Sequence, residues 1–306
     1  MSLLKPVIRT ACLAALLAAS SFGGIVPARV APLPVPEELQ AGTAMETAAV
    51  ESPILQEGED LKFAIKWGVV TAGYSSLKVQ NIETIEKRLA HHVVAEARSS
   101  GMVNTFYKVR DRNETWIDLR TPSTLRYARN IREGKYRLEE QVVLDQDSRR
   151  FYLRSYRADK KRHESKEGEI PANVLDVLGS FYYVRTLPLE VGRRFTIDVH
   201  SGDTVYPMVV SVKRRQRIKV KAGKFDCFVI EPELREPGIF ISKGKKLEVF
   251  ITADARRLPV LMRSEIFIGH VAAELVSHRT LPLTETYKVS RGRKTGPAAL
   301  PEQELE

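Results

Sequence analysis

Alternation of apolar and polar residues is the main pattern along this chain, and it is clearest in residues 247–252 and 259–268. A period of two predicts half-buried antiparallel strands, and the short connection 254–257 predicts that these two strands pair. The second face of the hairpin is mixed, because Phe250 and Phe267 lie among charged residues. One apolar face and one mixed face favour a curved sheet that encloses a concave side. We interpret the connection 254–257 as a structural turn.

The same alternation recurs at intervals of roughly ten residues, with Gly, Asn or Asp at many of the connections. The predicted strands are residues 61–67, 75–82, 91–99, 106–118, 125–132, 135–144, 149–157, 194–200, 204–213, 216–221, 225–232, 247–252, 259–268 and 271–277. The charged segment 159–169 is predicted to be a solvated loop. Apolar residues at helical spacing after Pro171 predict one helix, with Pro171 in its first turn and its end before Pro188.

These elements predict a mainly β fold. We expect a curved antiparallel sheet of about 12–15 strands that forms a half-barrel or barrel, with the helix capping or plugging its concave side. Residues 56–280 are predicted to be a single domain, because β-barrels of this size need not divide.

The two ends of the chain differ from this domain. Residues 1–28 have the cationic start, short apolar run and small residues of a secretory signal peptide, with cleavage predicted after Ala28. Residues 29–55 are rich in Pro and Ala and predict a flexible linker, and residues 281–306 predict a disordered tail. The apolar run is shorter than the roughly 20 residues that a spanning helix needs. We therefore expect an exported, periplasmic protein with no transmembrane span after cleavage.

The chain is basic, with a formal net charge of +10. Such a charge favours acidic partners, which are anionic lipid head groups, acidic glycans or nucleic acid, and export argues against nucleic acid. Arg217, Lys219 and Lys221 share one face of a strand and form a basic stripe. This stripe suits anionic lipid or glycan. It is more typical of a solvated outer face, or of an edge strand protected by lysines.

The familiar motifs of catalysis and metal binding do not occur. There is no HExxH zinc motif, no GxSxG nucleophile elbow and no phosphate loop. Cys227, in an apolar run, is interpreted as a small buried hydrophobic residue. We expect no enzyme, no cofactor and no metal, and keep a glycan hydrolase with two carboxylates as an alternative.

Aromatic side chains on the predicted sheet and helix are the candidate ligand-binding residues. They could stack on a sugar or pack on an acyl chain, but aromatic residues on strands are also typical of a core. The candidates are Trp67, Tyr107, Trp116, Phe181, Tyr182, Phe250 and Phe267.

Several short stretches, in order, resemble an exported bacterial family known as domain of unknown function 3108. They are Gly58-Glu59-Asp60-Leu61, Trp67-Gly68, Thr71-Ala72-Gly73, Val109-Arg110-Asp111, Asp176-Val177-Leu178, Tyr182-Tyr183-Val184-Arg185, Ala222-Gly223-Lys224-Phe225-Asp226-Cys227 and residues 252–260. The resemblance implies an exported β-rich protein. The fold that this family implies looks similar to the half-barrels of periplasmic lipoprotein carriers and to spiral-sheet envelope-integrity proteins.

Three functional hypotheses follow. The first is a non-enzymatic periplasmic protein of envelope maintenance that binds a lipid, an acyl chain or a glycan in the β concavity. The second is a scaffolding protein that binds an envelope protein partner, and the third is the hydrolase. Fold alone does not decide among them.

Overall fold

The computed structural model describes residues 55–234, 246–265 and 270–280. The predicted signal peptide, nearly all of the predicted linker, the predicted tail and Phe267 lie outside these residues.

Within the described residues the chain forms two short helices and fifteen strands. The helices are α2 (Gly101–Asn104) and α3 (Val177–Thr186). The strands are β1 (Asp60–Trp67), β2 (Val70–Ile85), β3 (Arg88–Ser99), β4 (Arg110–Asp118), β5 (Thr124–Glu133), β6 (Tyr136–Asp145), β7 (Arg150–Arg157), β8 (Arg162–Glu169), β9 (Leu175–Asp176), β10 (Arg194–Ser201), β11 (Thr204–Val220), β12 (Gly223–Leu234), β13 (Leu247–Thr252), β14 (Pro259–Glu265) and β15 (His270–Arg279).

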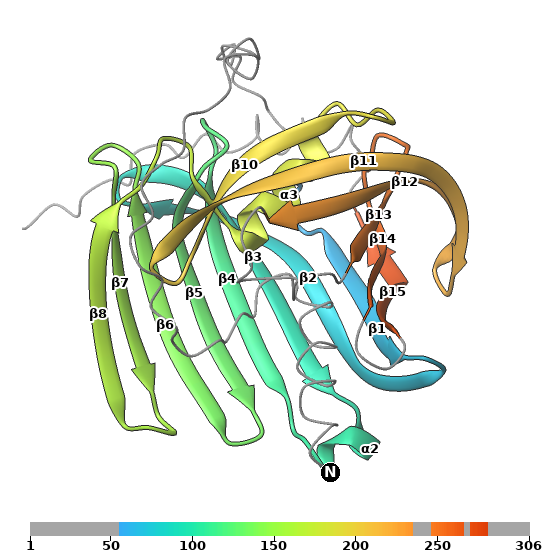
Figure 1. Ribbon diagram of the computed structural model, residues 1–306, viewed down its shortest axis with the longest axis horizontal. Helices are drawn as coiled ribbons and strands as arrows, with labels where there is room; N and C mark the ends of the chain where they lie inside the picture. The colour runs from blue at the N-terminus through green and yellow to red at the C-terminus, as the bar shows by residue number, and fades with distance from the viewer. Residues whose placement is uncertain (1–54, 235–245, 266–269, 281–306) are drawn as a thin grey trace, which may run out of the picture.

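All fifteen strands belong to one sheet, in the order β8-β7-β6-β5-β4-β3-β2-β1-β15-β14-β13-β12-β11-β10-β9. Neighbours are antiparallel except β9 and β10. The sheet curls until β10, the start of β11 and helix α3 lie across the strands β3–β6 (Figure 1). The prediction of a curved, mainly antiparallel sheet with a helix on its concave side is confirmed.

Strand β8 replaces the loop predicted at residues 159–169. It pairs with β7 along its whole length, from Arg157↔Arg162 to Arg150↔Glu169. Its side chains are mostly exposed on both faces, so it carries no apolar alternation that a sequence pattern could reveal. A charged edge strand of this kind resists pairing with other chains.

Strand β11 merges the two strands predicted at residues 204–213 and 216–221. Its register against β12 shifts between Val212 and Arg214. The extra residue of a β-bulge exchanges the two faces of a strand without ending it. The break in alternation at Lys213 was therefore wrongly interpreted as a connection.

Helix α3 begins at Val177, so the prediction of a first turn at Pro171 was wrong. Asp176 is the N-cap: its carboxylate accepts hydrogen bonds from the backbone N–H groups of Leu178 (3.0 Å) and Gly179 (3.1 Å). It also accepts hydroxyl bonds from Thr115 (2.5 Å) and Thr124 (2.7 Å) on strands β4 and β5. The cap therefore ties the helix to the sheet as well as starting it.

The core lies between α3 and the curled sheet. Eight of the ten residues of α3 are buried, as expected for a helix that sheet surrounds on several sides. The main cluster joins α3 to β1–β3 and to β10–β15. A second cluster joins β5–β7 to residues just before α3, with Val205 of β11 packed against it. The concave side is therefore filled by side chains at both of these places.

Asp176→Ala should destabilise the protein by about 2–4 kcal/mol, because it removes the helix cap and leaves two buried threonine hydroxyls without their acceptor. Urea unfolding measures this loss. Asp159→Ala is the control, since its carboxylate bonds only exposed groups near the β7–β8 turn, and it should change stability by no more than about 0.5 kcal/mol. Equal effects of the two changes would contradict the structural role of the cap.

Candidate functional site

The predicted aromatic site is divided among three separate clusters. Phe181, Tyr182 and Phe250 are 6%, 0% and 1% exposed in the main core, with Trp67 partly buried against it. Tyr107 packs with Val109 in a small cluster of its own. Trp116 belongs to a third cluster, on β3–β5. The structure thus brings four of the candidates together, as packed core residues.

Trp116 lies on the outer face of the sheet. Its neighbour Thr115 bonds the helix cap on the inner face, and successive side chains of a strand point to opposite faces. On the outer face His92 stacks on the indole at 4.5 Å, and Arg126 lies over it at 4.9 Å. The indole N–H donates to Glu83 at 2.8 Å. These partners hold Trp116 in place away from the concavity.

The inner face beside α3 has room for little more than a water molecule. A cavity there has a volume of about 10 Å³, close to the space of one water. Its lining includes Asn113, Tyr127, Arg129, Asp176 and His200. The Tyr127 hydroxyl and His200 Nδ1 lie 3.1 Å apart. Burial, together with the nearby Arg129 cation, lowers the pKa of His200 to about 4, so this histidine is neutral. An acyl chain does not fit here.

A much larger space lies on the outer face, between the β2–β3 turn and strands β6–β8. This groove has a volume of about 1000 Å³. Its lining mixes charged, amide, hydroxyl and apolar groups. The lining residues are Glu86, Lys87, Arg88, Leu125, Gln141, Val143, Leu144, Asp145, Gln146, Asp147, Ser148, Tyr152, Leu153, Arg154, Ser165, Lys166 and Glu167.

Cross-strand pairing builds the floor of the groove. Val143 of β6 pairs with Tyr152 of β7, which pairs with Glu167 of β8. In the neighbouring row Arg154 lies between Gln141 and Ser165. Tyr152 is 42% exposed although the residues on either side of it are buried in the second core cluster. The strands thus present one aromatic ring and several hydrogen-bonding groups to solvent.

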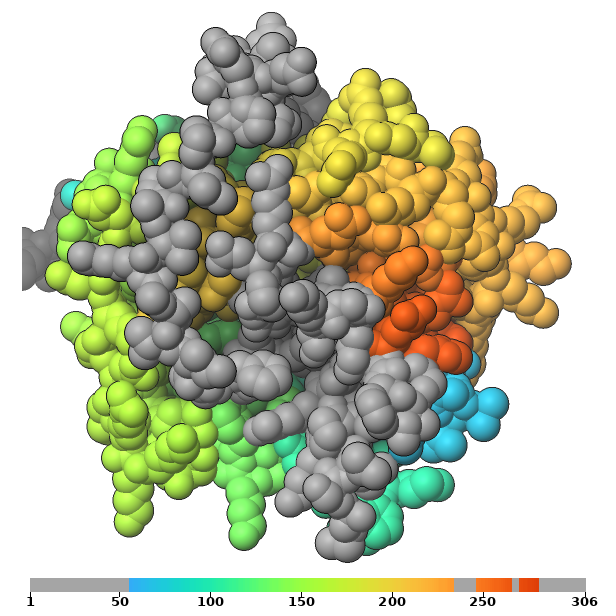
Figure 2. All heavy atoms as spheres, in the orientation of Figure 1, coloured from blue at the N-terminus to red at the C-terminus, as the bar shows by residue number. Residues whose placement is uncertain are grey.

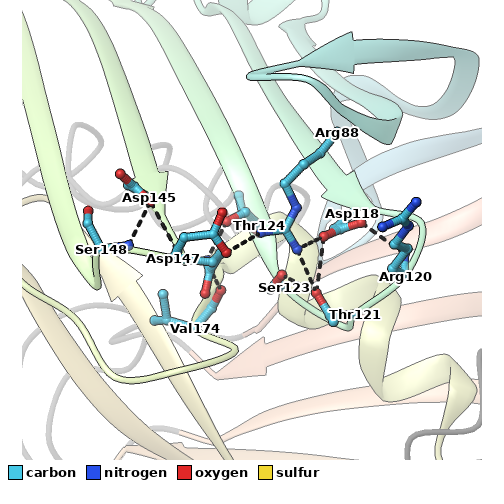
Figure 3. Close-up of polar contacts among 11 residues, drawn as sticks. Arg88, Asp118, Arg120, Thr121, Ser123, Thr124, Asp145, Asp147, Ser148 and Val174 are labelled. Atoms are coloured by element: carbon cyan, nitrogen blue, oxygen red, sulfur yellow. Dashed lines mark hydrogen bonds and ion pairs between the residues drawn. The ribbon is translucent and has the colours of Figure 1, made fainter.

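The rim of the groove is held by a network around Arg88 at the β2–β3 turn (Figure 3). Its guanidinium bonds Asp118, and it also reaches Thr121 (3.4 Å) and Asp147 (3.3 Å). Asp145 closes the β6–β7 turn: its Oδ1 accepts hydrogen bonds from the backbone N–H groups of Asp147 and Ser148, each at 3.0 Å. Bonds from Ser148 hold the pKa of Asp145 below its usual value. Both sides of the groove are therefore fixed by the protein itself.

Several charges of the groove are already paired. Glu167 pairs with Arg150 at 3.2 Å, and Lys166 pairs with Asp203 at 2.6 Å. Among the described residues Arg154 makes no ion pair, and it is exposed. It is therefore the cation most available to a ligand on the floor.

The groove was not predicted from the sequence, because the aromatic candidates were expected on the concave side of the sheet. The signal present in the sequence was Tyr152, a large aromatic residue at a polar position of an alternating strand. Of the predicted basic stripe, Arg217 and Lys219 are exposed on β11, and Lys221 is exposed in the turn that follows this strand.

The other predictions about chemistry can be compared with the described residues. Cys227 is fully buried, and burial raises the pKa of its thiol to about 12, so it is an unreactive core residue. In the described ranges no three His, Cys, Asp or Glu residues are grouped so that they could hold a metal ion. None of the described helices has the length and apolar character needed to cross a bilayer.

The fold and the groove define a class of protein: a curled antiparallel β-sheet with a filled concave side and a preformed outer groove. The chain belongs to the family described as Protein of unknown function (DUF3108), whose model matches residues 62–276. No curated protein matches the sequence.

Solved structures of similar fold have very different sequences. The β-barrel-like protein of the domain of unknown function DUF1849 from Brucella abortus aligns with a TM-score of 0.51 at 9% identity, covering 74% of this chain and 99% of its own. A protein from Bacteroides fragilis, described as exported and as having a YmcC-like fold, aligns with a TM-score of 0.34 at 8% identity, covering 74% and 97%. The first of these similarities supports the β-barrel-like fold and nothing beyond it.

Proposed function

We propose that this protein is a non-enzymatic, exported component of the bacterial cell envelope that binds a glycan in the outer groove. The observation that carries the proposal is the groove of about 1000 Å³, lined by alternating polar side chains around the exposed ring of Tyr152. Ligand sites of small molecules fall in the range of about 300–1,000 Å³.

The lining favours a sugar over a lipid. Sugars are bound by stacking on an aromatic face and by planar amide and guanidinium groups, and Tyr152, Gln141 and Arg154 supply these side by side. An acyl chain needs a dry apolar channel, since each buried polar group without a partner costs free energy. The groove is too polar for that purpose, and the inner cavity is too small.

A binding role without turnover is supported by the state of the carboxylates. Three of the four acidic residues that line the groove are held by protein partners: Asp145 by its turn, Asp147 by Arg88 and Glu167 by Arg150. A catalytic pair of carboxylates needs one free acid and one free base on either side of the sugar. Export itself is supported by the signal-like first 28 residues.

Titration calorimetry with cell-wall and outer-envelope oligosaccharides tests the proposal. Tyr152→Ala should weaken binding by about tenfold, because stacking on the ring is lost. Tyr74→Ala is the control: this tyrosine of β2 is similarly exposed, at 46%, but lies outside the groove. The sugar should be recovered intact. Binding that responds equally to both changes, or no binding of any oligosaccharide, would contradict a glycan site in the groove.

Binding of an envelope protein is the second candidate. Strand β8 ends the sheet, and its outer edge has no neighbouring strand among the described residues. An added strand from a partner could pair there. Its exposed charged residues oppose such pairing, which is why we rank it second.

A further inference from the structure

The distal half of the β11–β12 hairpin is supported on one face only. Beyond Val212, strand β11 has β12 on one side and no longer pairs with β10. The inner face of this half packs on the core through Ile218, Val220 and Phe225. The backbone N–H of Ala222, at the turn, donates to the carbonyl of Leu275 on β15 at 3.1 Å. These contacts fix the hairpin rigidly with its other face toward solvent.

That outer face carries five exposed cations. They are Arg215, Arg217, Lys219, Lys221 and Lys224. From residue 214 to residue 226 the only acidic residue is Asp226, and it pairs with Arg215. Within the part of the chain that the structure describes, the other four make no ion pair. We call these five residues the cationic hairpin face.

The arrangement of these charges is unfavourable for the isolated protein. Lys219 and Lys224 are direct cross-strand partners, and like charges directly opposite each other destabilise a strand pair. Arg215 and Arg257 both lie over the ring of Phe228, at 5.3 and 5.2 Å. Burial and the Arg215 cation lower the pKa of Arg257, against the nearby Asp254. The positive field therefore continues from the hairpin onto the β13–β14 turn.

Figure 1 shows where this surface points. The hairpin projects at one end of the molecule, on the right, whereas β8 and the groove strands β6 and β7 lie at the other end. In Figure 2 the gold side chains of this region extend away from the body of the protein. A large flat partner at the cationic hairpin face would therefore leave the groove strands free.

We propose that the cationic hairpin face docks the protein on a bilayer surface that contains anionic phospholipids. The face is formed by the two strands and their turn, and three of its five cations are lysines, which act as point charges rather than as geometric forks. Clusters of four to eight such cations bind anionic head groups by summed electrostatic attraction. Ala222 at the turn offers no large apolar side chain to insert. Docking is therefore peripheral, reversible and weakened by salt.

The alternative is that the lysines only protect a free strand edge. Among the described residues, 214–220 have one unpaired edge, and edge lysines oppose aggregation. This alternative predicts that neutral variants aggregate while vesicle binding stays the same. The docking proposal predicts that neutral variants stay soluble but bind vesicles more weakly.

Vesicle cosedimentation of the chain purified after export tests the proposal. The exported protein should bind vesicles with about 30% phosphatidylglycerol, should not bind pure phosphatidylcholine vesicles, and should dissociate when salt rises from about 0.05 to about 0.5 M. The triple variant R217Q/K219Q/K224Q should bind at least about tenfold more weakly. Because these side chains are exposed and Lys219 lies opposite Lys224, its circular dichroism should match that of the original protein and its thermal midpoint should not fall.

The matched control is K160Q/K161Q/R162Q at the β7–β8 turn, which removes the same charge from three other exposed residues. It should weaken vesicle binding by less than about twofold. If both triple variants lost vesicle binding equally, net charge alone would explain the binding, and the proposal would be overturned. Equal binding to neutral vesicles would overturn it as well, and so would binding only to an acidic polysaccharide through the same three residues. Glycan binding in the groove is measured separately with Tyr152→Ala, so either proposal can fail alone.

Discussion

Arg185→Met should destabilise the protein by about 3–5 kcal/mol, because it leaves the carboxylate of Glu59 buried without its partner. Both side chains are almost completely buried, at 0% and 2% exposure. The Arg185 guanidinium donates to Glu59 Oε1 at 2.9 Å and to Oε2 at 2.6 Å, and Arg185 Nε donates to the carbonyl of Arg257 at 2.9 Å. The pair thus joins the end of α3 to the start of β1 and to the β13–β14 turn.

Urea unfolding measures the loss, and two further variants make it specific. Arg112→Met removes two ion pairs of similar length, with Glu96 and Glu114 at 2.8 Å each, but the arginine is 46% exposed. It should therefore cost less than about 1 kcal/mol. The double variant R185M/E59L should recover a large part of the lost stability, since a buried ion pair can often be replaced by apolar side chains. If the double variant were as unstable as R185M, the isolated charge would not be the cause.

Asp111→Asn should stabilise the protein at pH 8 and leave it nearly unchanged at pH 4. Asp111 of β4 is 3% exposed and lies beside Glu133, which is 4% exposed. Burial first, and then the Glu133 carboxylate, raise the pKa of Asp111 to about 7, although the backbone N–H of Arg132 donates to it at 2.9 Å.

The sign follows from proton binding. Below about pH 4 the folded and unfolded chains both hold the Asp111 proton. Between about pH 4 and 7 the folded chain keeps it while the unfolded chain loses it, so folding becomes less favourable as the pH rises. Asparagine is neutral at every pH and avoids this loss, so the gain at pH 8 should be on the order of 1–3 kcal/mol. Urea unfolding at pH 4, 6 and 8 measures it.

The effect of Asp111 has to be measured as a difference in stability between the variant and the original protein. The reason is that His200 changes the pH dependence of stability in the opposite direction. Its pKa is lowered to about 4, so the stability it contributes is present above its unfolded pKa and is lost as the pH falls from about 6.5 to 4. The pH profile of the original protein therefore mixes the two. Asp145→Asn is a control of opposite sign, since the pKa of Asp145 is lowered and its loss should cost stability at pH 8. A stability difference for Asp111→Asn that does not change with pH would contradict the raised pKa.

Alternation along the chain was sufficient to predict the fold class and nearly all the strands. It failed where pairing, not side-chain pattern, decides the structure. Strand β8 is charged on both faces, and the bulge after Val212 interrupts the period without ending β11. The helix start was misplaced because the cap depends on Thr115 and Thr124, which are distant in the sequence from Asp176.

The candidate site was harder to predict for a related reason. A period of two shows which residues share a face, but it does not show toward which face the sheet curls. Trp116 was therefore placed in the concavity although it lies outside, and Tyr152 was passed over. The Arg185–Glu59 pair joins residues 126 positions apart, and no local pattern predicts such a contact.

The position of β1 also bears on how the chain reaches its folded state. β1 pairs with β2 along one edge and with β15 along the other. The second edge of β1 can therefore form its hydrogen bonds only when β15, the last strand among the described residues, is present. Closing a contact over so long a separation is slow. A chain without residues 270–279 would leave one edge of β1 unpaired in the middle of the sheet. The pairing of β1 with β15 therefore makes completion of the sheet depend on residues at both ends of the described chain.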